Sequence, residues 1–337
     1  MRLISLYRCV LTAVTGSVLL LSPLAVSTGL SDTRAVRPAV KAGSWYPANP
    51  AKLGVLVDTL LDEAPADPVE KNTAIRALIV PHAAYAYSGT TAAAAYRLIK
   101  GRSYRRVILL GPAHRALRER GLYILDTDGY QTPLGVVPLD QAVIKKLRQN
   151  PQVHEEPALH EREHSLEIQL PFLQRVLEPG WQLVPILLAT MQNADYLEAA
   201  EALRPLLDEE TLLVVSTDFT HYGAAFRYLP FPADVRIAKR LRELDTGAFR
   251  HLTAKDPEGF LNYRHDTGIT ICGYRAVALL LHLLPPESEV QLLQYTTSGG
   301  LNGNYSHSVS YIAAMVTAAA QPEDKKIVDG DREHSLN

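Results

Sequence analysis

The sequence predicts an α/β fold, in which a central, largely parallel or mixed sheet is covered by helices. The first observation is that short β-branched apolar stretches alternate along the chain with longer stretches of helical pattern. The second is that no repeat of fixed length and no linker rich in Pro, Ser or Gly divides the 337 residues. We therefore expect a single α/β domain over residues 31–320.

The strand candidates are short apolar runs, and the helix candidates are longer runs in which apolar and polar residues alternate with helical spacing. The predicted strands cover residues 77–80, 106–110, 183–188, 212–216, 291–295 and 309–316. The predicted helices cover residues 51–63, 90–100, 141–149, 166–177, 194–207, 233–244 and 269–284. The glycine-rich stretch 299–304 precedes a strand rather than a helix, so we expect a loop there and not a phosphate-binding site.

Both ends of the chain differ in composition from its body. Residues 1–30 combine a basic start with a short, diluted apolar run, which indicates a signal peptide or an N-terminal anchor. Ala25 and Ser27 fit a cleavage site, so we expect export to the periplasm or the medium, with a cytoplasmic location as the alternative. Membrane contact is expected only through an uncleaved leader. Residues 321–337 are polar and are expected to be a disordered tail.

Charge balance and cysteine count exclude several classes of function. The 34 Lys and Arg residues nearly balance the 36 Asp and Glu residues, and the signs are interspersed, so we expect no nucleic-acid partner. The two cysteines, Cys9 in the leader and Cys272, exclude a disulfide scaffold and a cysteine-rich zinc site. Cleavage would leave Cys272 alone in an oxidising compartment, where an unpaired thiol is a liability.

Three predicted strands are each followed within a few residues by a histidine, namely His82, His114 and His221. Sites in open α/β sheets form beyond the carboxyl ends of the strands, so parallel pairing would bring these imidazoles to one crevice. Neutral imidazole is the commonest metal ligand, and two histidines with one anionic ligand leave positions open for substrate or dioxygen. The pattern therefore favours a transition-metal site.

The candidates for the anionic ligand are Asp218, Glu163 and Cys272. Cys272 lies near the start of a predicted helix, whose N-terminus would lower the pKa of the thiol and favour the metal-binding thiolate. The structural alternative for Cys272 is a small buried apolar side chain. Asp218 could equally cap the helix that follows it or orient His221.

Residues 160–164, with the sequence HEREH, match the H-E-x-x-H pattern of zinc proteases and its inverted form. A zinc protease needs both histidines on one side of an apolar helix. This segment is densely charged, and its apolar face starts only at Leu166. We therefore expect Glu163, His164 and Glu167 to form a polar cluster at a helix start, where they cap the helix or line the crevice.

Six motifs, in order along the chain, resemble the Memo family, whose prokaryotic members are called AmmeMemoRadiSam system protein B. The motifs are Gly43-Ser44-Trp45-Tyr46-Pro47, Pro81-His82-Ala83-Ala84-Tyr85, Gly111-Pro112-Ala113-His114, Glu163-His164-Ser165-Leu166-Glu167, Ser216-Thr217-Asp218-Phe219-Thr220-His221 and Thr270-Ile271-Cys272-Gly273. The resemblance extends from about residue 37 to about residue 318, which is nearly the whole chain after the leader.

Memo proteins resemble the LigB-like class III extradiol dioxygenases, which are non-heme iron enzymes, in fold. The resemblance implies that His82, His114 and Cys272 are metal ligands and that His221 is an acid or base. The dioxygenases use a carboxylate as third ligand, so a cysteine departs from their pattern and argues against ring cleavage. A thiolate also widens the choice of metal, so we expect iron first, with copper and zinc as alternatives.

We expect a metal-binding protein with metal-dependent redox or dioxygenase-like chemistry on a small molecule that the sequence does not identify. His221, held by Asp218, would move protons beside the metal, and Glu163 and His164 would line the substrate wall. One alternative is a non-catalytic metal- or ligand-binding module that recruits protein partners. The other is a hydrolase that uses Cys272 as its nucleophile.

Overall fold

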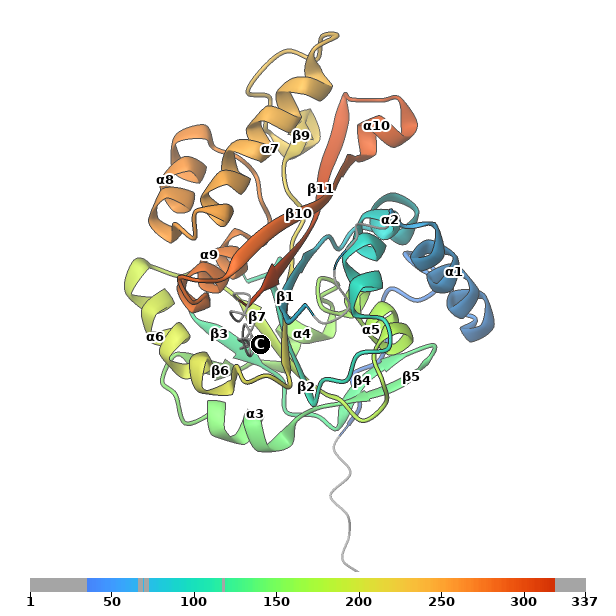
Figure 1. Ribbon diagram of the computed structural model, residues 1–337, viewed down its shortest axis with the longest axis vertical. Helices are drawn as coiled ribbons and strands as arrows, with labels where there is room; N and C mark the ends of the chain where they lie inside the picture. Colours follow the sequence, from blue (N-terminus) through green and yellow to red (C-terminus); the bar gives the residue numbers. More distant parts are fainter. Residues whose placement is uncertain (1–34, 66–68, 70–72, 117–118, 319–337) are drawn as a thin grey trace, which may run out of the picture. The chain divides into compact units, whose positions relative to one another are not determined.

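The fold is built on one large mixed sheet whose central strands are parallel (Figure 1). The computed structural model describes residues 35–65, 69, 73–116 and 119–318. The predicted leader and tail lie outside these residues. All described residues belong to one compact unit, and none of their helices is both long and apolar enough to cross a membrane.

The secondary structure of the described residues follows the predicted alternation. The strands are β1 (Ile75–Val80), β2 (Arg106–Pro112), β3 (Leu122–Ile124), β4 (Gly129–Thr132), β5 (Gly135–Pro138), β6 (Val153–Glu155), β7 (Gln182–Leu188), β8 (Thr211–Ser216), β9 (His221–Gly223), β10 (Glu289–Thr297) and β11 (His307–Thr317). The α-helices are α1 (Pro50–Glu63), α2 (Tyr85–Tyr96), α3 (Gln141–Leu147), α4 (Pro157–Glu161), α5 (Leu170–Val176), α6 (Asn193–Leu203), α7 (Ile237–Thr253), α8 (Pro257–Thr267), α9 (Tyr274–Leu283) and α10 (Ser298–Asn302).

The strand order in the large sheet is β10-β11-β1-β8-β2-β7-β3-β6, and β9 pairs with the start of β11. The strands β1, β8, β2 and β7 are parallel neighbours, whereas β11 runs antiparallel to β1 and β3 antiparallel to β7. Strands β4 and β5 form a separate hairpin. This confirms the predicted α/β architecture, a mixed sheet with helices packed against it.

The parallel strands form the core of the sheet. Strands β2 and β8 are buried over their whole length, and β1 leaves only Arg76 partly exposed. Continuous apolar strands of this kind are typical of parallel sheets covered on both faces. Helix α9 packs on β2 and β8, and α2 packs against β1, β10 and β11. The carboxyl ends of β1, β8 and β2 therefore lie side by side, and Val80 at the end of β1 pairs with Ser216 at the end of β8.

Several predicted elements differ from the structure, among them the helix expected over 233–244, which is observed as α7 (Ile237–Thr253). The helix expected over 166–177 is divided into a 3-10 turn at Glu167–Gln169 and α5. The helix expected from residue 269 begins only at Tyr274, because the chain before it is held by a hydrogen bond from the Cys272 backbone N–H to the Asp218 carbonyl. The loop expected over 299–304 contains the end of α10, whose first turn is capped by the Thr297 side chain.

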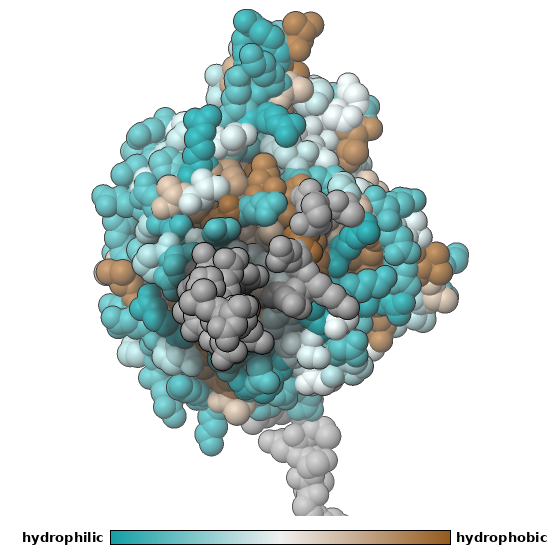
Figure 2. All heavy atoms as spheres, viewed as in Figure 1, coloured by the Kyte–Doolittle hydropathy of each residue, from teal (hydrophilic) through white to brown (hydrophobic). Residues whose placement is uncertain are grey.

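The face seen in Figure 2 is largely hydrophilic, and apolar residues gather where β10 crosses it. Strand β10 is an edge strand, so it has a hydrogen-bonded neighbour on one side only. Val290, Leu292 and Tyr295 of this strand are half-buried and pack against the core. The central strands, which carry the candidate site at their ends, are covered much more completely than this edge.

Candidate metal centre

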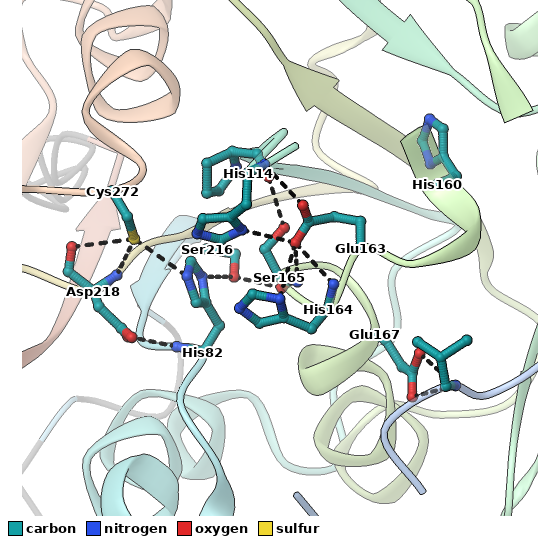
Figure 3. Close-up of polar contacts among 12 residues, drawn as sticks. His82, His114, His160, Glu163, His164, Ser165, Glu167, Ser216, Asp218 and Cys272 are labelled. Atoms are coloured by element: carbon teal, nitrogen blue, oxygen red, sulfur yellow. Dashed lines mark hydrogen bonds and ion pairs between the residues drawn. The ribbon is translucent and has the colours of Figure 1, made fainter. Parts of the chain in front are cut away.

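His82 lies two residues beyond β1, at the sheet edge where parallel strands end, and it is only 1% exposed. Its backbone N–H donates to Asp218 Oδ1 at 2.8 Å, which joins the loops after β1 and β8. The imidazole Nδ1 lies 2.9 Å from Ser216 Oγ, and the Nε2 lies 3.2 Å from Cys272 Sγ (Figure 3). The Nε2 is therefore the nitrogen that His82 presents on the side of the cysteine.

The Glu163 carboxylate holds two further imidazoles beside His82 (Figure 3). Its Oε1 lies 2.9 Å from His114 Nδ1 and 3.3 Å from His164 Nδ1. Burial alone would raise the pKa of Glu163, but the hydrogen bond from His114 and the charges of both histidines hold it well below its ordinary value. A carboxylate only accepts hydrogen bonds, so His114 Nδ1 carries the hydrogen and its Nε2 keeps a lone pair for a metal. The hydrogen bond that His164 makes to Glu163 comes from its backbone N–H, at 2.8 Å.

The imidazoles of His82, His114 and His164 form one cluster. The ring centroid of His82 lies 5.2 Å from that of His114 and 5.3 Å from that of His164. The centroids of His114 and His164 are 4.5 Å apart. One nitrogen from each ring lies within 4.8 Å of the other two, so the group could hold a metal ion. Burial lowers the pKa of His82, and burial with the charge of His82 lowers that of His164 to about 3. Both rings are thus neutral at pH 7, the form that binds metal.

Cys272 lies beside this cluster. Its Sγ contacts His82 Nε2 and accepts a hydrogen bond from the Asp218 backbone N–H, both at 3.2 Å. The prediction that a helix N-terminus lowers the pKa of this thiol is wrong. Cys272 lies two residues before α9, and burial, followed by the charge of Asp218, raises its pKa. Without a metal the side chain is therefore a thiol at neutral pH, and only a bound cation would stabilise the thiolate.

Asp218 and His221 have different partners from those expected. Asp218 accepts from the His82 backbone, and within the described ranges no hydrogen bond joins it to His221. Instead, His221 Nδ1 lies 2.9 Å from the Phe219 carbonyl oxygen and 3.0 Å from the Thr270 carbonyl oxygen. Since carbonyls only accept, Nδ1 carries the hydrogen, and no hydrogen bond to Nε2 is found among the residues that the structure describes. Backbone carbonyls, and not Asp218, orient His221.

His160, the first histidine of the HEREH segment, lies apart from the cluster (Figure 3). Its Nε2 lies 3.1 Å from the Tyr123 carbonyl oxygen, to which it donates, and its Nδ1 accepts from the Tyr130 hydroxyl at 2.7 Å. Helix α4 ends between His160 and His164, so the two do not share one helix face. The zinc-protease alternative therefore has no structural basis in this segment.

Glu167 anchors the N-terminal segment of the domain and does not line the centre. It is fully buried, pairs with Arg37 and accepts from the Tyr46 hydroxyl at 2.6 Å. This anchoring places Trp45 against His164, with ring centroids 4.5 Å apart. The predicted cluster of Glu163, His164 and Glu167 is thus split, with Glu167 in a structural role.

The structure brings most of the predicted site residues together, and it also changes their grouping. His82 and His114 meet as expected from their strands, but the third member of the histidine group is His164 and not His221. His221 is near enough for its charge to lower the pKa of His82. Ser216 was not singled out from the sequence, although its position at the end of a predicted strand, directly before the Thr217-Asp218 pair, was a usable signal.

Comparison with known proteins gives a consistent match over the domain. The family described as Memo-like protein matches residues 37–315. A MEMO1 family protein of Methanopyrus kandleri is 32% identical over 291 residues, which is 82% of this chain and 97% of the relative. The MEMO1 protein of Homo sapiens is 30% identical over 301 residues, covering 86% of this chain and 99% of the relative.

Two further matches extend the comparison. A MEMO1 family protein of Nitrosopumilus maritimus is 29% identical over 282 residues. A solved structure of an uncharacterized protein from Escherichia coli K12 covers 71% of this chain with a TM-score of 0.43 and 14% identity. The family match extends over the strands, the loops and the histidine cluster described above. The chain belongs to the Memo family.

Proposed function

We propose that this protein binds one transition-metal ion through His82, His114 and Cys272, with His164 as a fourth donor. The observation that carries the proposal is the convergence of three imidazoles, each with one nitrogen within 4.8 Å of the others. His114 has its Nδ1 hydrogen held by Glu163, which leaves Nε2 as its donor atom. Cys272 Sγ adds a sulfur donor 3.2 Å from His82 Nε2.

The chemistry of these donors suits a mononuclear site, and the spacing of one pair supports it, while Cys272 lies outside the group of donor atoms that are all within 4.8 Å of one another. Nitrogen and sulfur ligands at about 2.0–2.3 Å from a tetrahedral metal lie about 3.5 Å from each other. The 3.2 Å separation of Cys272 Sγ and His82 Nε2 is close to that value. Imidazole and thiolate together suit iron, copper and zinc, and we propose iron first because of the dioxygenase-like resemblance.

The chemistry proposed for the centre is metal-dependent oxidation or reduction of a small molecule, with dioxygen as a candidate oxidant. A bound metal would supply the redox step. His221 would accept or return a proton through Nε2 beside the substrate, since its Nδ1 hydrogen is held by carbonyls. Trp45, against His164, would form part of the substrate wall. Asp218 would act by holding the His82 loop.

The first test is metal analysis of protein reconstituted separately with Fe(II), Zn(II) and Cu(I). We expect one metal ion per chain in the natural protein and loss of that metal in the His82→Ala and Cys272→Ala variants. The matched control is His160→Gln, which alters a buried histidine outside the cluster and should keep full stoichiometry. Unchanged stoichiometry in both His82→Ala and Cys272→Ala would refute the proposal.

One observation favours a second candidate, a hydrolase with Cys272 as nucleophile and His82 as its base, because the two atoms are 3.2 Å apart. The raised pKa of Cys272 and the lowered pKa of His82 both oppose the ion pair that such an enzyme needs. Stoichiometric alkylation of Cys272 in metal-free protein would support the hydrolase. Protection of the thiol by metal would support the metal centre.

Measurement of oxygen consumption by the metal-loaded protein distinguishes redox catalysis from a purely binding role. A metal-loaded protein that consumes oxygen in the presence of a reductant or a catechol supports redox catalysis. A loaded protein inert to both supports a non-catalytic module, for which protein partners would be the next search.

A further inference from the structure

Behind His82, on the side away from Cys272, lies a chain of buried polar side chains that the proposed ligand set does not use. Ser216, Gln169 and Tyr96 are each 0% exposed. Buried polar groups of this kind destabilise a core unless every hydrogen bond is made, so the pattern of donors and acceptors among them is constrained.

The hydroxyl of Ser216 has one hydrogen and three polar neighbours. The Ser165 carbonyl oxygen lies 2.6 Å from Ser216 Oγ, and a carbonyl can only accept, so the hydroxyl hydrogen points to Ser165. The Oγ must then act as acceptor toward its other neighbours. His82 Nδ1, at 2.9 Å, is one of them, so it carries a hydrogen and donates to Ser216.

Gln169 supplies the other donor to Ser216 and fixes the direction of the chain. Its Nε2 donates to Ser216 Oγ at 2.8 Å and to the Pro81 carbonyl oxygen at 2.9 Å. A flipped amide would place its oxygen against the Pro81 carbonyl, where neither atom has a hydrogen to donate. The Oε1 accepts from the Tyr96 hydroxyl at 2.9 Å, so the amide is satisfied at both ends.

We infer that Ser216 and Gln169 are positioning residues that hold His82 in the tautomer with hydrogen on Nδ1, so that the lone pair of Nε2 faces the candidate metal centre. The inference rests on the proposed function for its purpose but not for its geometry, since the contacts exist without a metal. Glu163 imposes the same tautomer on His114 through a carboxylate. A neutral hydroxyl does this for His82, which avoids a second buried charge beside Asp218.

The direct test is nitrogen NMR of the His82 ring in metal-free protein labelled with ¹⁵N-histidine and assigned with His82→Gln. We expect a protonated Nδ1 and an unprotonated Nε2 in the natural chain. A ring protonated on Nε2 would overturn the inference without any variant. This readout does not depend on metal binding, so it separates failure of the positioning role from failure of the proposed function.

The variant test uses Ser216→Ala, which removes the acceptor for Nδ1, and Ser216→Thr, which keeps the hydroxyl. The matched control is Ser88→Ala, because Ser88 is also buried and donates to the Ala83 carbonyl in the same loop without touching His82. We expect Ser216→Ala to lose the single tautomer and to weaken Fe(II) or Zn(II) affinity about 10- to 100-fold. The Ser216→Thr and Ser88→Ala variants should change the metal affinity less than Ser216→Ala does.

The outcomes are distinct. If Ser216→Ala keeps the tautomer and the affinity of the natural chain, the positioning role is refuted. If Ser216→Ala does not fold, Gln169→Met replaces it, with the expected result of mixed tautomers and a weaker metal affinity. If the natural chain binds neither metal but shows the Nδ1 hydrogen, the tautomer assignment stands and the proposed function fails.

Discussion

The surroundings of His160 predict how much the unfolding free energy of the protein depends on pH. It is 1% exposed, and both ring nitrogens are used by the neutral form, because Nε2 donates to the Tyr123 carbonyl while Nδ1 accepts from the Tyr130 hydroxyl. Protonation would place a hydrogen on Nδ1 and oppose the hydrogen of Tyr130. The perturbation is His160→Gln, which fills a similar volume but does not titrate.

Burial is the main cause that lowers the pKa of His160, from 6.5 to about 4. Because the folded protein resists protonation, the stability due to the neutral ring is fully present above pH 6.5 and is lost as the pH falls toward 4. A shift of about two and a half units corresponds to about 3 kcal/mol. Between pH 7 and pH 4, the unfolding free energy of the natural protein should therefore fall by about 3 kcal/mol more than that of the His160→Gln variant.

The assay is urea unfolding of both metal-free proteins at several pH values, followed by circular dichroism. Other groups titrate in the same range, but they do so in both proteins, so the difference between the two isolates His160. We expect the difference to shrink by about 3 kcal/mol toward pH 4. A difference that stays constant from pH 7 to pH 4 would show that His160 is not held neutral by burial.

Three further substitutions test other parts of the account. Glu163→Gln removes the carboxylate that orients the His114 imidazole, and we expect metal affinity in a titration to fall about 10- to 100-fold; an unchanged affinity would contradict its role. Arg37→Met leaves the buried Glu167 charge without its partner and should lower the unfolding free energy by about 3–5 kcal/mol, measured in urea. A loss below about 1 kcal/mol, the value typical of a solvent-exposed ion pair, would contradict the anchoring role of Arg37 and Glu167. Gly273→Ala would put a Cβ 2.8 Å from the Ser216 carbonyl oxygen, so we expect about 1–3 kcal/mol of destabilisation and a displaced Cys272 that alkylates at a different rate.

The central sheet could be predicted from the sequence because its parallel strands are continuous apolar runs. Strand β8 (Thr211–Ser216) was predicted within one residue for this reason. The short strands β3 (Leu122–Ile124) and β6 (Val153–Glu155) were missed, because three residues are too few to show a period. Strand β3 is held by its pairing with β7, and β6 by its pairing with β3.

The site was predictable in part for a related reason. His82 and His114 follow parallel strands directly, so topology alone brings them together. His164 reaches the cluster from a loop, through its contact with Glu163. The sequence pattern placed His164 in the crevice wall, but its place in the histidine group depends on how this loop folds. The thiol pKa was predicted with the wrong sign, since burial of Cys272 outweighs a helix N-terminus that starts two residues later.

The central claim is that His82, His114 and Cys272 bind one metal ion. The most direct measurement is an anomalous difference map from a crystal of the metal-loaded protein. We predict a single peak among His82 Nε2, His114 Nε2 and Cys272 Sγ, at about 2.0–2.1 Å from the nitrogens and about 2.3 Å from the sulfur. A loaded crystal whose only peak lies elsewhere, or whose peak lies beyond bonding distance of Cys272 and His82, would contradict the account.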